Sequence, residues 1–376
     1  MTMKIASTNS LPLLDLKGTW REIGRAHGEA ARDRIAHNLD LYFRRFSLEG
    51  GVNRTAARRR GALYLEVIDK NVPDYAEMMR GLAEASGHDL IDIATLNARY
   101  EILYSEFSRT VMEASVKPDG CTAFAALPDS TPDSHLRIGQ NWDWIPDVQG
   151  LLLRIQLPDG LRILCFTEAG IAGGKIGLNS AGLGLAINGL MSDQDDWFRL
   201  GTPFHVRTWQ ILTSHTVEAA LDAILSEDRS CSANFLIGHA AHDGTATVVN
   251  IETSPTSAAR IDVRSGVLAH ANHFLNPAPL GISQPFDDYS STHQRCNRMQ
   301  RLLDQHHGHL DDARLTALLG DHNGYPQSLC VHPTTDWPEE EQFQTVFSTV
   351  INLTSRELLA ASGNPCQAPF ERYAFI

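Results

Sequence analysis

The sequence predicts an α+β fold in which antiparallel sheets stack on each other and are covered by helices. Residues 19–106 show helical periodicity and are rich in Ala, Arg, Glu and Leu, whereas from about residue 117 short apolar segments alternate with Pro, Asp, Gly and Ser. Strands come in blocks with helices between the blocks, and strict βαβ alternation is absent. We expect a helical N-terminal segment, 1–120, and a sheet-rich segment, 121–376, that together form one folded domain.

The N-terminal segment carries the start and stop signals of several helices. Ile23 and His27 recur at helical spacing in the first of them. Asp74 follows a proline and is placed to cap a second helix, which Gly87 closes, and Asp89 is placed to cap a third. This part of the chain therefore predicts a group of helices that precedes the sheets.

The sheet-rich segment carries short apolar runs between turn residues. The tripeptide Ser-Ala-Gly at 180–182 separates two of these runs and predicts a β-hairpin, with the glycine near the turn. Helical periodicity returns at 203–227, 291–303 and 312–319. The expected strands are 121–127, 136–144, 151–157, 161–166, 175–179, 183–190, 234–241, 245–252, 258–263, 267–274, 345–353 and 357–361.

Composition and charge exclude several classes of protein. The 376 residues include 45 acidic and 32 basic side chains, and the net charge of −13 disfavours nucleic acids and anionic membranes as partners. The chain has no apolar run of about 18 residues, which a spanning helix needs. Residues 1–15 lack the features of a signal peptide, so we expect a cytoplasmic protein.

The six cysteines form neither a CxxC motif nor a Cys/His cluster at zinc-finger spacing. His270 and His273 indicate a metal only weakly, because no third ligand has a helpful spacing. We therefore expect no metal site, and no disulfide framework in a long cytosolic chain. Most of the thiols are expected to be small buried hydrophobic groups, with at most one or two of them reactive.

Gly120 and Cys121 lie where the helical segment ends and the first predicted strand begins. If the peptide bond between them breaks, Cys121 becomes an N-terminal residue with a thiol nucleophile and an α-amine whose pKa is about 7.7 to 8. That amine can act as the general base near neutral pH. Gly120 leaves the thiol an open approach to the preceding carbonyl, so an N-to-S acyl shift and hydrolysis can free the new terminus. The alternative is a buried cysteine after a turn.

The next predicted strand carries polar residues between indoles. Alternation places Asn141 and Asp143 on one face of the strand, and Trp142 and Trp144 on the other. A carboxylate stabilises a neighbouring ammonium, so Asp143 could hold the Cys121 amine in position. An edge strand with a solvated face is the alternative interpretation.

Two amides and a pair of arginines are further candidates for the site. Asn188 interrupts an apolar strand, and Asn272 lies at the end of another. An amide N–H aimed at the reacting carbonyl builds an oxyanion hole, worth about 3 to 4 kcal/mol when it is the key donor. Arg295 and Arg298 share a helix face, and one of them could pair with Asp143, the thiolate or a substrate carboxylate. Strand-end caps and a solvated helix face are the alternatives.

Taken together, these residues resemble those of the acyl-coenzyme A:6-aminopenicillanic acid acyltransferase family, the isopenicillin-N acyltransferase-like cysteine Ntn-hydrolases. The matching stretches span most of the chain. They are Glu22-Ile23-Gly24, His27-Gly28, Asp119-Gly120-Cys121-Thr122, Gly139-Gln140-Asn141-Trp142-Asp143, Lys175-Ile176-Gly177-Leu178-Asn179-Ser180-Ala181-Gly182, Asn272-His273, Asp321-His322, Gly324-Tyr325-Pro326 and Gly363-Asn364-Pro365.

The resemblance implies a four-layer αββα Ntn-hydrolase sandwich and a precursor that cuts itself before Cys121. It implies Cys121 as nucleophile and general base, Asp143 as a site residue beside it, and Asn272 as an oxyanion donor. The hairpin that ends at Asn188 and the helix that carries the arginine pair are more distantly similar to those of bile-salt and penicillin V hydrolases. One departure is the run Glu-Glu-Glu-Gln at 339–342, which precedes a strand near which the fungal acyltransferase is expected to use an arginine on its substrate.

The expected activity is that of an autoproteolytic amidohydrolase or acyltransferase. Its substrates would be small N-acyl compounds with a linear amide bond, attacked through a thioester without a cofactor, and acyl-coenzyme A is a candidate acyl donor. The two fragments of the cut chain are expected to stay associated. The alternatives are an uncleaved Cys–His thiol hydrolase, a β-alanyl-amine hydrolase and a binding protein that kept the fold without the cut.

Overall fold

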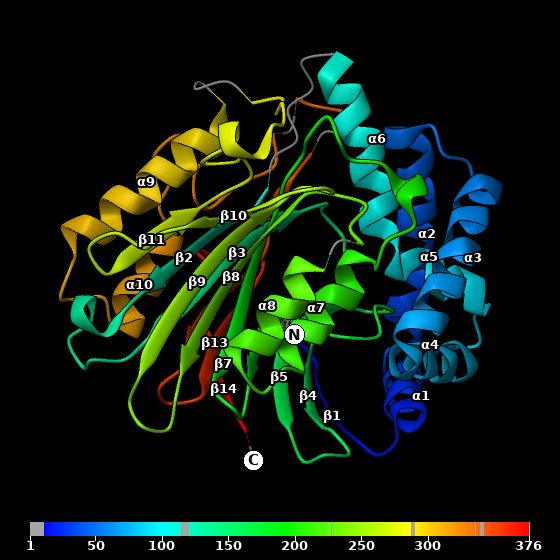
Figure 1. The fold of residues 1–376 in the computed structure, drawn as a ribbon, viewed down its shortest axis with the longest axis horizontal. Coiled ribbons are helices and arrows are strands. Elements are labelled where there is room, and N and C mark those ends of the chain that lie inside the picture. The colour runs from blue at the N-terminus through cyan, green and yellow to red at the C-terminus, as the bar shows by residue number, and fades with distance from the viewer. Residues whose placement is uncertain are drawn as a thin grey trace, which may run out of the picture.

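Two stacked β-sheets form the centre of the molecule, as Figure 1 shows for the computed structural model. The structure describes residues 11–113, 120–226, 228–286, 290–334, 336–338 and 342–375. The eight-stranded sheet contains, in spatial order, β1 (Leu13–Lys17), β4 (Gly150–Gln156), β5 (Arg162–Glu168), β6 (Ile176–Asn179), β7 (Leu183–Gly189), β8 (Ala233–Ala240), β9 (Ala246–Thr253) and β10 (Ala258–Ile261). The six-stranded sheet contains β11 (Val267–His270), β2 (Thr122–Ala126), β3 (Arg137–Trp144), β12 (Gln344–Asn352), β13 (Glu357–Ser362) and β14 (Glu371–Ala374). Within the described residues, neighbouring strands pair antiparallel except β1, which runs parallel to β4.

Helices cover both sheets and complete a four-layer αββα sandwich (Figure 1). On the six-stranded sheet lie α9 (Ser291–Gln305) and α10 (Asp312–Leu319), and on the eight-stranded sheet lie α7 (Phe204–Leu212) and α8 (Val217–Leu225). The helices at the side of the sheets are α1 (Trp20–Ala30), α2 (Arg32–Gly50), α3 (Arg54–Asn71), α4 (Pro73–Ser86), α5 (Leu90–Asn97) and α6 (Arg99–Glu113). The predicted fold class is confirmed.

Several of the predicted punctuation signals lie at the ends of observed elements. Asp89 caps α5, because its side chain accepts a backbone N–H of the first turn at 2.7 Å. Gly87 ends α4 in the left-handed conformation, with φ at 78°. Asp74 lies inside the first turn of α4 rather than before it, because Pro73 begins the helix. Gly182 has φ at 99° in the turn between β6 and β7, and the predicted hairpin is confirmed.

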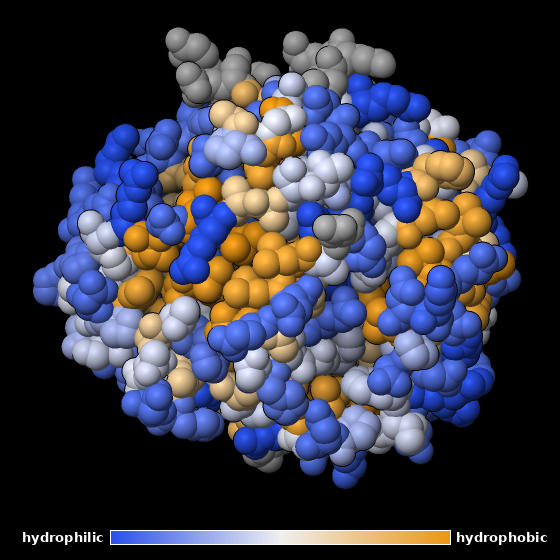
Figure 2. All heavy atoms as spheres, viewed as in Figure 1, coloured by the Kyte–Doolittle hydropathy of each residue, from blue (hydrophilic) through white to orange (hydrophobic). Residues whose placement is uncertain are grey.

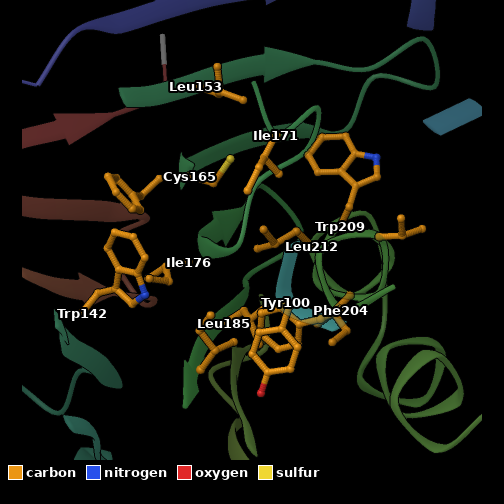
Figure 3. Packing of buried hydrophobic residues seen from close by; sticks show 14 of the residues in the cluster. Tyr100, Trp142, Leu153, Cys165, Ile171, Ile176, Leu185, Phe204, Trp209 and Leu212 are labelled. Carbon is orange, nitrogen blue, oxygen red and sulfur yellow. The ribbon is translucent and has the colours of Figure 1, made fainter. Parts of the chain in front are cut away.

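Most buried apolar side chains belong to one core between the two sheets and the N-terminal helices. Figure 3 shows part of it, where Tyr100 of α6 and Phe204 of α7 stack with their ring centroids 4.1 Å apart, beside Leu185 of β7. A second core fills the space between the six-stranded sheet and α9 and α10. Strands β2 and β3 are therefore covered on both faces, and the alternation of side chains decides which core each residue faces.

Four elements differ from the expectations. Strands β1 and β14 are short edge strands, five and four residues long, and too few side chains alternate there for a pattern to show. The predicted helix at 203–227 is two helices, because Thr216 caps α8 with its side chain. Strand β11 ends at His270, so Asn272 and His273 lie in the loop that follows the strand.

The face of the molecule drawn in Figure 2 is largely polar, with apolar side chains gathered over the central strands and, to the right, over the N-terminal helices. The large apolar side chains that are most exposed are Leu48, Phe198, Leu225, Leu275 and Tyr325. In the part of the chain that the structure describes, no helix combines the length and the apolar character needed to cross a membrane.

Candidate active site

Gly120 and Cys121 lie directly before β2, between the two sheets. Cys121 is 5 % exposed and faces the main core, as Ala123 does, while Phe124 faces the core under α9 and α10. A Cβ atom on Gly120 would come within 2.6 to 2.7 Å of the side-chain amide of Asn272, so a larger residue would collide there. The junction is therefore enclosed, and one of the predicted site residues touches it.

Arg295 of α9 donates hydrogen bonds to both carbonyl groups of the junction and is 1 % exposed. Its Nη1 donates to the carbonyl oxygen of Gly120 at 2.5 Å, to that of Cys121 at 3.0 Å and to Oγ1 of Thr122 at 2.9 Å. Its Nη2 donates to Oδ1 of Asn272 at 3.3 Å. A buried guanidinium in this position can stabilise negative charge on the Gly120 oxygen.

Asn272 contacts the junction from the loop after β11. Its backbone N–H donates to Oγ1 of Thr292 at 2.7 Å, and its Nδ2 donates to the carbonyl of Gly189 at 3.0 Å. These two bonds fix the amide against Gly120. In the intact chain Arg295 donates to the Gly120 carbonyl. The oxyanion role that the sequence predicts for Asn272 stays a prediction.

Asp143 lies fully buried in β3, beside the end of β2 that carries Cys121. Oγ1 of Thr345 donates to its Oδ1 at 2.5 Å, and Nη1 of Arg295 lies 3.8 Å from its Oδ2. Burial, followed by the charge of Asp143, raises the pKa of the Cys121 thiol to about 12, against a backbone hydrogen bond from Asp143 and the charges of Lys175 and Arg295. The thiol of the intact chain is therefore protonated at neutral pH.

A chain of three buried amides runs from the junction across the eight-stranded sheet. Nδ2 of Asn188 donates to the Cys121 carbonyl at 3.2 Å, and Nδ2 of Asn234 donates to Oδ1 of Asn188 at 3.0 Å. Asn234 and Asn250 exchange two further bonds of 3.0 and 2.8 Å. Sequence reasoning identified Asn188 alone. The signal for the other two was the same, an amide in the middle of an apolar strand.

A cavity of about 20 Å³ lies beside the thiol and has room for about one water molecule. Trp142 and Trp144 line it, on the opposite face of β3 from Asp143 as predicted. Its walls are Arg99, Tyr100, Tyr104, Cys121, Trp142, Trp144, Lys175, Ile187, Gly189 and Phe204. The wall is thus largely aromatic, with two charged side chains in it.

Two buried cations in the cavity wall share one buried carboxylate. Nζ of Lys175 lies 2.5 Å from Oε1 of Glu168 and 3.2 Å from the centroid of the Trp142 ring. Nε of Arg99 donates to Oε2 of Glu168 at 3.0 Å. Burial lowers the pKa of Lys175 to about 7, although Glu168 opposes the change. Burial alone would raise the pKa of Glu168, but Arg99 and Lys175 outweigh it and lower that pKa. Sequence reasoning missed this cluster.

Two predicted site residues point their side chains elsewhere. Arg298 donates to the carboxylate of Asp321 at 3.0 and 2.6 Å, so of the arginine pair it is Arg295 that reaches the junction. Nδ2 of Asn141 donates to the carbonyls of Leu319 and Leu329 at 2.9 and 2.7 Å. Asn141 therefore anchors the loop after α10 instead of lining the cavity. Asp119 and residues 339–341 lie outside the described residues.

The fold and the position of the junction define a class of protein. A four-layer αββα sandwich of two largely antiparallel sheets is the Ntn-hydrolase fold, and the candidate nucleophile precedes an inner strand of it. The chain belongs to the acyl-coenzyme A:6-aminopenicillanic acid acyl-transferase family, whose sequence profile matches residues 130–367. That stretch includes Asp143, Asn188, Asn272 and Arg295, and the family predicted from the motifs is confirmed.

The chain is also similar to several individual proteins. The chain is 29 % identical over 356 residues to the 40 kDa form of acyl-coenzyme A:6-aminopenicillanic-acid-acyltransferase of Emericella nidulans, which covers 93 % of this chain and 92 % of the relative. It is 28 % identical over 133 residues to an uncharacterized protein of Archaeoglobus fulgidus, covering 32 % and 22 %. Two variants of conjugated bile acid hydrolase from Clostridium perfringens superpose with TM-scores of 0.43 and 0.42 at 12 % identity, covering 68 % of this chain and 97 % of theirs.

Proposed function

We propose that this acyltransferase-family protein cuts its own chain between Gly120 and Cys121 and then uses Cys121 as an N-terminal nucleophile on linear amides. The observation that carries the proposal is the hydrogen bond from Nη1 of Arg295 to the Gly120 carbonyl oxygen, at 2.5 Å in a buried site. A charged donor at this carbonyl stabilises the oxyanion that forms when the neighbouring thiol attacks.

Scission starts with attack of the Cys121 sulfur on the carbonyl carbon of Gly120. The oxygen of Gly120 becomes an oxyanion that the Arg295 guanidinium stabilises, and the thiol proton passes to the departing nitrogen. The C–N bond breaks, which leaves a thioester and the free α-amine of Cys121. Water then hydrolyses the thioester, releasing a Gly120 carboxylate and the thiol.

Turnover of a substrate repeats these steps on an external amide. The acyl carbonyl takes the place of the Gly120 carbonyl, within reach of Arg295 and the Asn272 amide. The α-amine of Cys121 accepts the thiol proton and returns it to the leaving amine, while the Asp143 carboxylate stabilises the ammonium form. Water completes hydrolysis of the acyl-thioester, or a second amine or thiol such as coenzyme A exchanges the acyl group with it.

A second candidate is hydrolysis of β-alanyl amines or other amides with a cationic leaving group. A cleft of about 360 Å³ shares α6 with the thiol cavity, and its other wall is formed by residues 192–197, which follow β7. Its acidic residues are Glu106, Asp193, Asp195 and Asp196. Such a cleft favours an amine over a carboxylate next to the reacting bond. The uncleaved Cys–His alternative has less support, because none of the described residues that line the thiol cavity is a histidine.

Denaturing gel electrophoresis of the purified protein tests the scission. Fragments of 120 and 256 residues, about 13 and 28 kDa in proportion to the 41.5 kDa chain, are expected, with the larger one beginning Cys-Thr-Ala-Phe by Edman sequencing. A Cys121→Ala variant is expected to stay intact and inactive. A Cys121→Ala protein that still splits would exclude the autocatalytic route. A panel of N-acyl amides and acyl-coenzyme A donors, tested on the cut form, then separates hydrolysis from transfer and neutral from cationic leaving groups.

A further inference from the structure

Four metal-ligating side chains meet at one point away from the thiol cavity. His322 follows α10, Cys330 and His332 lie between α10 and β12, and Cys366 lies between β13 and β14. Their four donor atoms all lie within 4.8 Å of one another. Three separate segments of the chain therefore bring two thiols and two imidazoles to a common centre.

Four of the six distances between these atoms are close to the edges of a tetrahedral site. The two sulfurs of Cys330 and Cys366 are 3.6 Å apart, and Nε2 of His332 is 3.4 Å from each of them. Nε2 of His322 lies 3.1 Å from Nε2 of His332. A tetrahedron with Zn–S bonds of about 2.3 Å and Zn–N bonds of about 2.05 Å has edges of about 3.8 Å for S···S, 3.6 Å for S···N and 3.4 Å for N···N. Each observed edge agrees to within about 0.3 Å.

We propose that His322, Cys330, His332 and Cys366 bind one Zn²⁺ ion as a structural Cys2His2 site. Two thiolates and two neutral imidazoles make the bound ion electrically neutral, and the two thiol protons are released to solvent on binding. Four protein ligands close the coordination sphere, which is typical of a structural rather than a catalytic zinc. From the absence of a CxxC spacing we expected no metal site, and a zinc ion bound here would contradict that expectation.

Neighbouring groups support the sulfur ligands. Nδ2 of Asn364 donates to the Cys330 sulfur at 3.4 Å and to the carbonyl of Val331 at 2.6 Å, so it orients the ligand and can stabilise its thiolate form. Cys330 itself is fully buried, whereas His322 and Cys366 are exposed. The site is thus half open to solvent, which gives the ion a path of entry.

The same segment supports the carboxylate of the candidate active site. Val331, between two of the ligands, donates its N–H to Oγ1 of Thr345 at 2.9 Å and accepts the N–H of Thr345 at 3.0 Å. That hydroxyl donates in turn to Asp143 at 2.5 Å. A bound ion would fix the 322–332 loop and, through Thr345, the position of Asp143.

Metal analysis of the full chain, purified without a polyhistidine tag, tests the site. We expect about one zinc per chain by mass spectrometry of the metal, and Co²⁺ in its place should give thiolate charge-transfer bands and tetrahedral visible bands. His322→Ala and Cys366→Ser alter exposed side chains, so they should fold, and each should weaken Zn²⁺ binding by about 10- to 100-fold or more in a chelator competition. His307→Ala, another exposed histidine, is the matched control and should bind as the unchanged protein does.

Three results would overturn the proposal. One is a chain that binds no Zn²⁺ or Co²⁺ with its thiols reduced. Another is a His322→Ala/Cys366→Ser double variant that keeps full affinity. The third is a Cys330–Cys366 disulfide, found by mass spectrometry, in protein purified under reducing conditions. Metal content is measured separately from scission and activity. The zinc proposal can therefore be refuted while the proposed function stands, and the proposed function can be refuted while the zinc proposal stands.

Discussion

Replacing Arg295 by methionine is expected to slow scission of the chain by a factor of about 10² to 10³. Methionine keeps an unbranched side chain of similar course but removes every donor. Among the oxygens that Nη1 contacts, only that of Gly120, at 2.5 Å, gains charge as the sulfur attacks. Loss of one oxyanion donor costs about 2.7 to 4 kcal/mol of transition-state stabilisation, which corresponds to that range of rates.

The same substitution also changes the folded state, so stability has to be measured separately. Thr122 and Asn272 each lose a donor, whereas the Cys121 carbonyl keeps its bond from Asn188. An unsatisfied buried acceptor costs about 1 to 3 kcal/mol. Urea unfolding of the Arg295→Met variant in a Cys121→Ala background gives this cost without interference from scission.

The assay follows the intact mass of freshly refolded protein over time. Arg298→Met, on the same helix but paired with Asp321, is the matched control and should be cut at the unchanged rate. Arg295→Lys retains the charge and should recover part of the rate. A folded Arg295→Met protein that is cut as fast as the unchanged chain would refute the assignment of Arg295 to the oxyanion.

Three further outcomes are expected. Gly120→Ala should slow scission by about tenfold or more, because the added methyl group would lie 2.6 to 2.7 Å from the Asn272 amide and must displace it. The intact mass of the protein over time measures the rate, and scission at the unchanged rate would contradict this crowding. The scission rate should rise with pH between about pH 6 and 9. The pKa of the Cys121 thiol is raised to about 12, and below that pH the thiolate fraction grows tenfold per pH unit. A rate that does not change with pH, measured on gels of quenched samples, would argue against attack by the thiolate. Asn234→Leu should lower the free energy of unfolding by about 1 to 3 kcal/mol, because the side chains of Asn188 and Asn250 lose their hydrogen-bond partner. An unchanged urea unfolding curve would mean that the chain of amides contributes no stability.

Local patterns predicted the parts of the site that depend on neighbouring strands. Alternation in β3 separates Asp143 from the two tryptophans, and antiparallel pairing with β2 brings Asp143 next to Cys121. The choice between Arg295 and Arg298 could not be made in this way. The choice depends on how α9 is rotated against β2 and β11. That rotation is determined by tertiary packing and cannot be read from the spacing of the two arginines.

The Cys2His2 cluster shows a second limit of sequence reasoning. Zinc-finger spacing works because short loops bring neighbouring ligands together, but here Cys366 is far along the chain from His322. Only the return of β13 beside β12 closes the distance. The buried pair of cations on Glu168 escaped notice for a similar reason, since Arg99 comes from α6 and Lys175 from the chain before β6.

The edge strand β1 and the N-terminal helices join the first 120 residues to the core, and this affects how the protein can refold after scission. Before scission, the first 120 residues and the rest are one covalent chain, so their encounter during folding is intramolecular. After the proposed scission the same interface would join two polypeptides, and recovery from denaturation would become a bimolecular reaction that dilution slows. The stability of the mature enzyme would then be kinetic: it would depend on a slow rate of unfolding, because the separated fragments would refold together only slowly.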